Sequence, residues 1–342
     1  MAAILVSFLS LICIKPSNSF KLMMSLNNDV QGNSIWTTVT RPLKRMVIES
    51  SREKIRSRGK EIGSDIQADV EYYLNEPVLS KIQSIQMDIE NKYISYPEYY
   101  KQEFHGYVNG NLDWLPAFEY QSVSESVFSD VFSKIKLSKQ SNRRLRENAQ
   151  RAMRKYLESH RFVPRVIVDM GCAIGLSTLP LARSFTQAEV IGIDLSSYFL
   201  ATAVYNLNTN EELIDLRSRI SYMHGAAESC GLPSSSVDLV SFSLMEHELP
   251  NQAALDVIRE AHRTLRPGGV IAFMDMDPES IYIKNFNKNW LAKAAFAVTE
   301  PWFQDFCRFP MEEMLKANNF VDIKNVKTSP KHRTILALKK GM

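Results

Sequence analysis

Cysteine is scarce in this 342-residue chain. The four cysteines, Cys13, Cys172, Cys230 and Cys307, lack the paired spacing of a disulfide framework or a zinc site. We therefore predict neither disulfide bonds nor a bound metal. Hydrophobic residues make up 45% of the chain, which is enough for a large packed core and typical of a globular protein.

The body of the chain also lacks an excess of positive charge. Residues 1–63 contain ten Lys or Arg and four Asp or Glu, whereas residues 64–342 contain 31 and 34, a net charge of −3. A nucleic-acid-binding surface needs clustered basic residues, so we predict no nucleic-acid partner. We interpret the basic run at residues 41–58 as a solvated tether.

The apolar stretch at residues 1–14 is shorter than the roughly 20 residues that a membrane-spanning helix needs. The small polar residues 16–19 follow it, which is typical of a cleavable signal sequence, although no Lys or Arg precedes the apolar stretch. The alternative is a plain apolar N-terminus. We expect residues 1–19 to be a signal-like segment and the mature chain to begin near Phe20 or beyond.

Residues 20–63 follow as a transit-like and tether segment. Up to Arg45 this segment is rich in Ser, Thr and Asn and contains a single acid, Asp29, as in transit peptides. A signal sequence, a phenylalanine and a transit-like stretch together resemble the bipartite presequences of algae with secondary plastids. The resemblance implies a plastid protein. The alternatives are the endomembrane lumen and the cytoplasm.

A glycine turn at residues 171–175 follows the β-branched run 165–168, which is typical of a strand buried on both faces. This turn lacks the third glycine of a dinucleotide-binding fingerprint, because the fingerprint positions hold Gly171, Ala173 and the bulky Leu176. The turn opens into a helix at Ser177. We infer a cofactor site, and the missing glycine argues against a dinucleotide.

The spacing Asp169-x-Gly171-x-x-x-Gly175 suits S-adenosylmethionine instead. This cofactor has no phosphate, but it carries an amino acid group and a cationic sulfonium, for which Asp169 supplies negative charge. A second buried strand, residues 189–194, ends in Asp194, whose carboxylate can accept hydrogen bonds from both ribose hydroxyls. Asp194 indicates a nucleoside without saying which one. Its alternative role is that of a charge partner for a helix N-terminus.

The segments 168–175 and 265–273 resemble the first motif and the post-helix signature of Rossmann-like S-adenosylmethionine-dependent methyltransferases. The resemblance covers about residues 163–340. It points to ubiquinone/menaquinone-type C-methyltransferases and to plastid-targeted plant methyltransferases of unassigned substrate. Residues 225–228 resemble the adenine-binding turn Gly-Asp-Ala-Glu of that family, but Ala226 replaces the Asp, and Glu228 is the candidate to substitute for it.

The resemblance implies S-adenosyl-L-methionine as cofactor and a set of residues that bind it. These cofactor-binding residues are Asp169, Gly171, Cys172, Ala173, Gly175, Asp194, Leu195, Ala226, Ala227, Glu228 and Ser243.

The order of predicted elements gives the fold class. We expect an α/β fold with a seven-stranded Rossmann-like methyltransferase sheet over residues 161–342, closed by a C-terminal antiparallel hairpin. The predicted strands are 165–168, 189–194, 219–224, 236–243, 270–274, 320–326 and 332–338, with helices at 197–207, 251–265 and 310–318.

Residues 64–160 are predicted to be a helical N-terminal region, with helices at 65–74, 77–92, 125–137 and 141–157. Between them, residues 99–114 are crowded with aromatic side chains. This stretch can form a lid over a pocket and contribute His105, Tyr107 and Trp114. The alternative is an aromatic plug that packs the helical layer. Residues 281–307 are predicted to form helices on the substrate side.

His247 is the main catalytic candidate. It follows the fourth strand, where ligands bind in open α/β sheets, and the acids Glu246 and Glu248 flank it. Either acid could orient the ring or raise its pKa. The alternative is that His247 only shapes the pocket. We include Glu246, Tyr107 and His105 in the predicted catalytic set.

These residues predict a methyltransferase that acts on a small molecule, with a plastid prenylquinone or a related isoprenoid aromatic as acceptor. A quinone acceptor would bring the protein to a membrane surface. One alternative is S-methylation of a small thioether acid, as in algal sulfoniopropionate synthesis. Two others are a nucleotide-sugar or NAD enzyme, which Leu176 disfavours, and a non-catalytic assembly factor that binds the cofactor. The type of atom methylated and the oligomeric state are left open.

Overall fold

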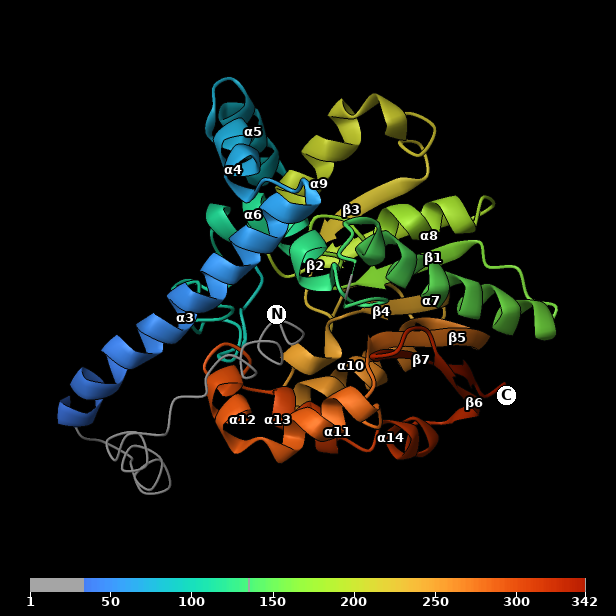
Figure 1. The fold of residues 1–342 in the computed structure, drawn as a ribbon. Helices are drawn as coiled ribbons and strands as arrows, with labels where there is room; N and C mark the ends of the chain where they lie inside the picture. The colour runs from blue at the N-terminus through green and yellow to red at the C-terminus, as the bar shows by residue number, and fades with distance from the viewer. Residues whose placement is uncertain (1–33, 135, 342) are drawn as a thin grey trace.

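The computed structural model describes residues 34–134 and 136–341. A seven-stranded sheet with strand order β3-β2-β1-β4-β5-β7-β6 forms its centre (Figure 1). The first five strands in this order are parallel, and β7 runs antiparallel between β5 and β6. The strands are β1 Val166–Met170, β2 Glu189–Asp194, β3 Ile220–His224, β4 Val237–Ser243, β5 Leu265–Met276, β6 Phe320–Lys327 and β7 His332–Lys339. The predicted fold class is confirmed.

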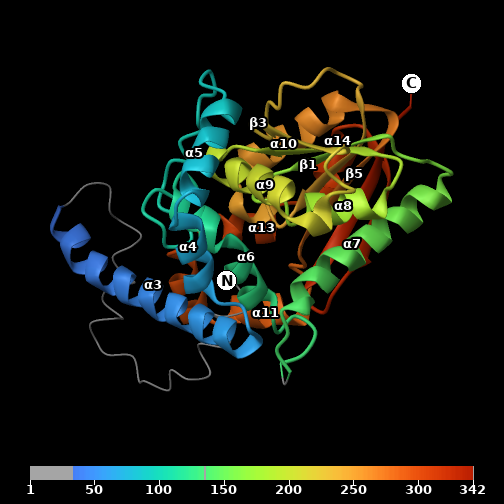
Figure 2. The same ribbon diagram turned by 90° about the horizontal axis from the view of Figure 1, so that it is seen from above.

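Apolar side chains cover both faces of the sheet. One buried cluster joins the central strands to α7 (Gln140–Ser159) and α8 (Thr178–Ser184). A second cluster on the other face joins them to α10 (Asn251–Thr264) and α14 (Met311–Ala317). Figure 2 shows these two helix pairs on opposite sides of the strands. The uninterrupted burial of β4 up to Phe242 explains its continuous apolar sequence.

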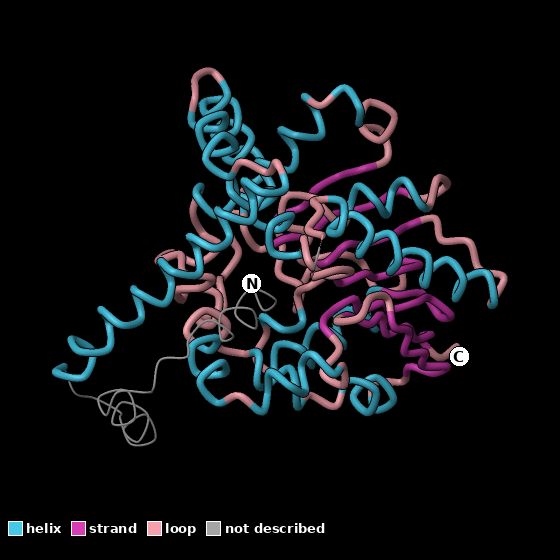
Figure 3. Tube along the Cα trace, viewed as in Figure 1, coloured by secondary structure: helices cyan, strands magenta, loops and turns pink. Residues whose placement is uncertain are grey.

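The N-terminal helices pack beside the sheet at its β2 and β3 side (Figures 1 and 3). They are α3 (Ser34–Ile62), α4 (Ile66–Leu74), α5 (Val78–Ile89) and α6 (Trp114–Phe128). Helix α5 lies along α9 (Ser197–Thr209), and both α3 and α4 contact α6. Ser196 caps α9 as predicted, since its hydroxyl accepts a hydrogen bond from the amide of Phe199 at 3.2 Å.

The interpretation of residues 41–58 as a solvated tether was wrong. These residues belong to α3, where Ile55 is 4% exposed and packs in a cluster with Ile66 and Val127. Arg52 forms an ion pair with Glu119 of α6 at 2.8 Å. The many basic residues on the outer face of α3 make the helical spacing of its buried residues hard to recognise in the sequence. The basic run therefore resembles an unstructured segment. The predicted signal-like segment, residues 1–19, lies outside the described residues.

The helix predicted at residues 125–137 is also displaced. Helix α6 begins at Trp114, where the Asp113 side chain accepts a hydrogen bond from the Trp114 amide, and it ends at Phe128. It is buried on most sides by its neighbours, so its sequence lacks the one-sided apolar period that marks surface helices. Three short helices follow β5: α11 (Ile281–Lys288), α12 (Trp290–Ala297) and α13 (Phe303–Arg308).

Two smaller elements complete the described chain: the 3-10 turns η1 (Glu211–Leu213) and η2 (Glu246–Glu248). Among the described residues, no helix is both long enough and apolar enough to cross a membrane.

We predict that Ile55→Ala lowers the free energy of unfolding by about 2–5 kcal/mol, because it opens a cavity between α3, α4 and α6. Urea denaturation followed by circular dichroism measures this change. The control is Ile214→Ala, the same truncation at a residue that is 60% exposed, which should cost less than about 0.5 kcal/mol. Equal stability of Ile55→Ala and the wild type would contradict the packing of α3.

Candidate functional site

The glycine turn after β1 has a backbone that few residues adopt. Gly171, Ala173 and Gly175 have φ angles of 67°, 47° and 88°. A left-handed alanine is strained, and such strain is concentrated at functional sites. At Gly171, an added Cβ would lie 2.3 Å from the sulfur of Met245. The glycine is therefore needed both for its φ angle and for the close approach of this side chain.

Asp194 holds the turn in place. Its Oδ2 accepts a hydrogen bond from the Ala173 amide at 2.8 Å, and its Oδ1 accepts one from the Ser196 amide at 2.8 Å. Burial raises the pKa of Asp194 to about 6, and the two amides oppose this shift. The carboxylate is therefore ionised at neutral pH, and it lines a cavity.

Asp169 lies beneath the turn and is completely buried. Its Oδ2 accepts hydrogen bonds from the hydroxyls of Ser177 and Thr178, both at 2.7 Å, at the start of α8. Its Oδ1 has no hydrogen-bond partner among the described residues. Burial raises the pKa of Asp169 to about 6. An ionised oxygen without a partner at this depth is suited to a cationic group bound on the turn.

We call the cavity over this turn the glycine-turn cavity. It is lined from the sheet side by Gly171, Ala173, Ile193, Asp194, Leu195, Gly225, Ala227, Glu228, Met245 and Leu249. Residues of the predicted lid cover it, namely Tyr99, Tyr100, Phe104, His105 and Asn111. The Tyr99 hydroxyl donates a hydrogen bond to Glu228.

A second cavity, which we call the helix cavity, lies between the N-terminal helices and α11–α13. Its apolar lining comprises Ile55, Ile66, Pro116, Val123, Val127, Phe128, Phe199, Leu244, Met276, Ile283, Phe286, Phe296 and Phe303. The space not filled by atoms, including the part open to solvent, is about 1520 Å³, against about 860 Å³ for the glycine-turn cavity. The predicted substrate-side helices therefore do line a pocket.

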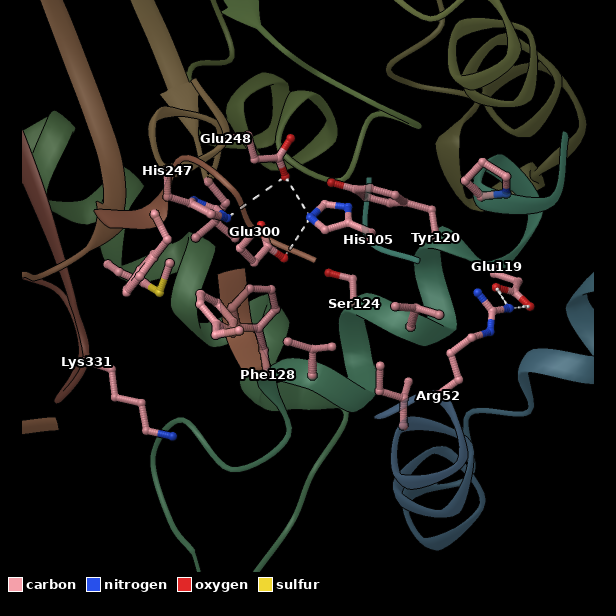
Figure 4. Close-up of a pocket in the computed structure, with 18 of the residues that line it drawn as sticks. Arg52, His105, Glu119, Tyr120, Ser124, Phe128, His247, Glu248, Glu300 and Lys331 are labelled. Carbon is pink, nitrogen blue, oxygen red and sulfur yellow. Dashed lines mark hydrogen bonds and ion pairs between the residues drawn. The ribbon is translucent and has the colours of Figure 1, made fainter. Parts of the chain in front are cut away.

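The two cavities adjoin. Five residues line both of them: His105, Asn111, Tyr120, Phe199 and Glu248. Figure 4 shows the Glu248 carboxylate and the His105 ring facing each other beside the Tyr120 hydroxyl. The two cavities therefore share a wall at this junction.

Two histidines and three acids form a cluster at the junction, in which His105 and Glu248 are partly exposed and the others are buried. The Nε2 of His105 lies 3.0 Å from Glu300 and 3.5 Å from Glu248. The Nε2 of His247 lies 3.9 Å from Glu248, and its Nδ1 lies 2.8 Å from Asp275 at the end of β5. Glu248 is thus placed between two imidazole rings.

The charges of this cluster follow from burial and from these contacts. Burial lowers the pKa of His247, but the charge and hydrogen bond of Asp275 outweigh it and raise the pKa to about 9. Burial raises the pKa of Glu248 to about 7, although His105 and His247 oppose the shift. At neutral pH His247 is therefore protonated, and Glu248 is close to its midpoint of titration.

Comparison with known proteins shows which cofactor this arrangement binds. The family described as "Methyltransferase domain" matches residues 167–269. An uncharacterized methyltransferase of Synechocystis is 30% identical over 125 residues, which cover 36% of this chain and 50% of the relative. Residues 167–269 form an S-adenosylmethionine-dependent methyltransferase domain.

Other relatives of this methyltransferase domain differ in their named substrates. A trans-aconitate 2-methyltransferase of Azoarcus is 36% identical over 107 residues, covering 31% of this chain and 37% of the relative. A ubiquinone/menaquinone biosynthesis C-methyltransferase of Syntrophotalea carbinolica is 30% identical over 111 residues, covering 32% and 43%. The chain thus spans half or less of the length of these relatives.

Among solved structures, a methyltransferase from Aquifex aeolicus is similar with a TM-score of 0.43 and 15% identity, covering 57% of this chain and 92% of that chain. Human N-acetylserotonin methyltransferase is similar with a TM-score of 0.47 and 14% identity, covering 79% and 69%.

The methyltransferase domain brings six of the eleven predicted cofactor-binding residues to the wall of the glycine-turn cavity: Gly171, Ala173, Asp194, Leu195, Ala227 and Glu228. The other five, Asp169, Cys172, Gly175, Ala226 and Ser243, do not line it. Asp169 acts from below the turn. Gly175 is needed for packing, because it has a left-handed φ angle and an added Cβ would clash with the Tyr222 hydroxyl.

Three of the four predicted catalytic residues line a cavity, and one does not. His105, Tyr107 and His247 line the helix cavity, whereas Glu246 lines neither cavity. Trp114 packs against Phe118 and Tyr198 in the helical layer, as the plug alternative expects. His105 instead lines both cavities, as the lid interpretation expects. No group of described residues has the arrangement of a metal site.

Sequence reasoning missed Asp275, Glu300 and Tyr120. Asp275 could have been found, because it is an acid at the end of a strand, like Asp169 and Asp194. The predicted fifth strand stopped at Met274, one residue short of it. Tyr120 lies in α6 and Glu300 in the connection between α12 and α13, both remote in sequence from His247, and nothing in their local pattern marks them.

The residues present fit S-adenosylmethionine. Asp194 offers a carboxylate to the ribose hydroxyls from the cavity wall, and the buried carboxylate of Asp169 beneath the turn favours a cationic group on it. We predict that Asp194→Asn and Gly171→Val each weaken binding of S-adenosylhomocysteine by about 10- to 100-fold, equivalent to about 1–3 kcal/mol.

Isothermal titration calorimetry measures these affinities. Asp215→Asn, the same change at an exposed position of the same domain, is the control and should bind like the wild type. Wild-type affinity in both site variants, with unchanged circular dichroism, would contradict the cofactor assignment.

Proposed function

We propose that the protein transfers the methyl group of S-adenosylmethionine to an apolar small molecule bound in the helix cavity. The observation that carries this proposal is the junction at which His105, Tyr120 and Glu248 line both cavities. When bound, the cofactor supplies an electrophilic methyl group on a sulfonium.

The protein's contribution is to position the acceptor and to exclude water. Methyl transfer is an in-line displacement, so alignment of the two reactants supplies much of the rate enhancement. The aromatic side chains Phe128, Phe286, Phe296 and Phe303 hold an apolar acceptor, while Tyr99, Tyr100 and Phe104 cover the glycine turn. An apolar enclosure also solvates a positive charge poorly. It therefore favours the reaction, in which the sulfonium loses its positive charge.

Glu248 is the group placed to accept a proton from the acceptor. It lines both cavities, and its pKa of about 7 suits a base at neutral pH. His247 was our candidate from the sequence, but Asp275 holds its ring protonated, so it has no free lone pair at neutral pH. The ring nitrogens of His247 and His105 instead flank the Glu248 carboxylate, and, against the effect of burial, nearby acids raise the pKa of both rings.

For the acceptor we propose a prenylquinone or a related isoprenoid aromatic of a plastid. The apolar helix cavity and the ubiquinone/menaquinone relative support this choice. A quinone acceptor would bring the protein to a membrane surface.

The second candidate is a small thioether acid, which the basic side chains Lys134 and Lys331 in the cavity wall favour. A non-catalytic assembly factor would not need the cluster around Glu248.

The pH dependence of turnover separates these acceptors. If Glu248 is the base, kcat rises as pH increases through about 7, because the carboxylate is ionised above its pKa. If His247 is the base, the rise lies near pH 9. A thioether carries no proton to remove, so its kcat would not depend on either group.

We predict that Glu248→Gln lowers kcat by roughly 10²–10⁴-fold and abolishes the rise near pH 7, with S-adenosylhomocysteine affinity within a few-fold of the wild type. Formation of S-adenosylhomocysteine with a short-chain prenylated hydroquinone as acceptor provides the assay. Glu246→Gln is the control, since it makes the same change in the same turn but at a residue that lines neither cavity.

Retention of wild-type kcat by Glu248→Gln would remove Glu248 as the base. If the hydroquinone is not methylated, comparison of the metabolites of a strain lacking the gene with those of its parent identifies the class of the acceptor.

We also propose a plastid location, on the grounds of the signal-like and transit-like composition of residues 1–45. A fluorescent reporter fused to residues 1–45 should enter the plastid of an alga with a secondary plastid. A reporter that stays in the cytosol would contradict the targeting proposal and leave the methyltransferase proposal untouched.

A further inference from the structure

The helix cavity has a charged region away from the junction. Lys134, Asp130 and Lys331 line it there, between the loop that follows α6 and the turn that precedes β7. Figure 4 shows Lys331 on the opposite side of the pocket from Arg52 and well separated from Glu248. Methyl transfer to a neutral prenylquinone would not use these three residues.

Positive charge exceeds negative charge in this region. The Nζ of Lys331 lies 2.9 Å from the Oδ1 of Asp130, and Arg58 lies 3.5 Å from the Oδ2 of the same carboxylate. The ammonium groups of Lys134 and Lys331 both lie 5.5 Å from the ring of Tyr282. Asp130 therefore contacts two cations, and a third, Lys134, approaches the same ring as Lys331.

The pair formed by Lys331 and Asp130 is also shielded from water. The side chains of Lys331 and Asp130 are 11% and 4% exposed. Burial lowers the pKa of Lys331, Asp130 opposes this shift, and the nearby Lys134 and Arg58 lower the pKa further. A buried ammonium that one carboxylate must share with other cations gains from another anion.

We infer that the acceptor carries an anionic group, a carboxylate, sulfonate or phosphate, that binds at Lys331 and Lys134. This inference rests on the proposed function, because it assigns the molecule in the helix cavity. The acceptor is then amphiphilic: its anionic end lies at the two lysines, its apolar body lies along Phe128 and Phe286, and its nucleophile reaches Glu248. Of the acceptors proposed above, an isoprenoid aromatic that bears such an anionic group meets this condition, whereas a neutral prenylquinone would leave the excess positive charge uncompensated.

Two fluorescent probes that differ only by a sulfonate test this inference. They are 1-anilinonaphthalene-8-sulfonate and the neutral N-phenyl-1-naphthylamine, titrated with saturating S-adenosylhomocysteine so that the glycine-turn cavity is filled. We predict that Lys331→Met raises the Kd of the sulfonate about tenfold and leaves the Kd of the neutral probe within about twofold. Lys134→Met should raise the sulfonate Kd about two- to fivefold, because Lys134 is more exposed.

Lys331→Arg should retain the wild-type affinity for the sulfonate. Lys136→Met is the control, since it removes the same charge from an exposed residue of the same loop that does not line the cavity, and it should change neither Kd. Unchanged sulfonate binding in Lys331→Met would overturn the inference. The inference would also be overturned if Lys331→Met raised the Kd of both probes equally while Lys134→Met bound the sulfonate like the wild type.

The outcome is independent of the proposed catalysis. Probe affinity needs no turnover, so the anion site stands or falls without the assay of Glu248. If the protein proved not to be a methyltransferase, the sulfonate preference would remain measurable, and its loss in Lys331→Met would still identify an anion site.

Discussion

The carboxylate of Asp194 is the point on which the cofactor site depends. It accepts hydrogen bonds from the amides of Ala173 and Ser196. These bonds connect the turn after β1 to the start of α9, which follows β2. Ala173 would not keep its left-handed conformation without such support. The same carboxylate faces the cavity, so the group that fixes the turn is also the group offered to the ligand.

Sheet topology places the rest of the site. Strand order reverses between β1 and β4, and ligands of open α/β sheets bind beyond the carboxyl ends of the strands at this point. The turn η2 follows β4 there and presents His247 and Glu248, while Asp275 at the end of β5 holds the His247 ring. The N-terminal helices then close the acceptor side and bring His105 to Glu248.

The sheet and most of the glycine turn could be predicted from the sequence, because buried parallel strands read as short apolar runs and each ends at the turn or acid that follows. Asp194 was found in this way. Helix α3 was not, because its charged outer face dominates its composition and its buried Ile55 becomes apparent only beside α4 and α6. Glu300 could not be predicted either, because only the folded structure brings it into contact with His105.

The central claim is that a methyl donor on the glycine turn meets its acceptor at the junction of His105, Tyr120 and Glu248. A crystal structure with S-adenosylhomocysteine tests it most directly. We expect the ribose hydroxyls to bind Asp194 and the sulfur to face the junction, open toward the helix cavity. A ribose remote from Asp194, or a sulfur walled off from Glu248 and the helix cavity, would contradict it.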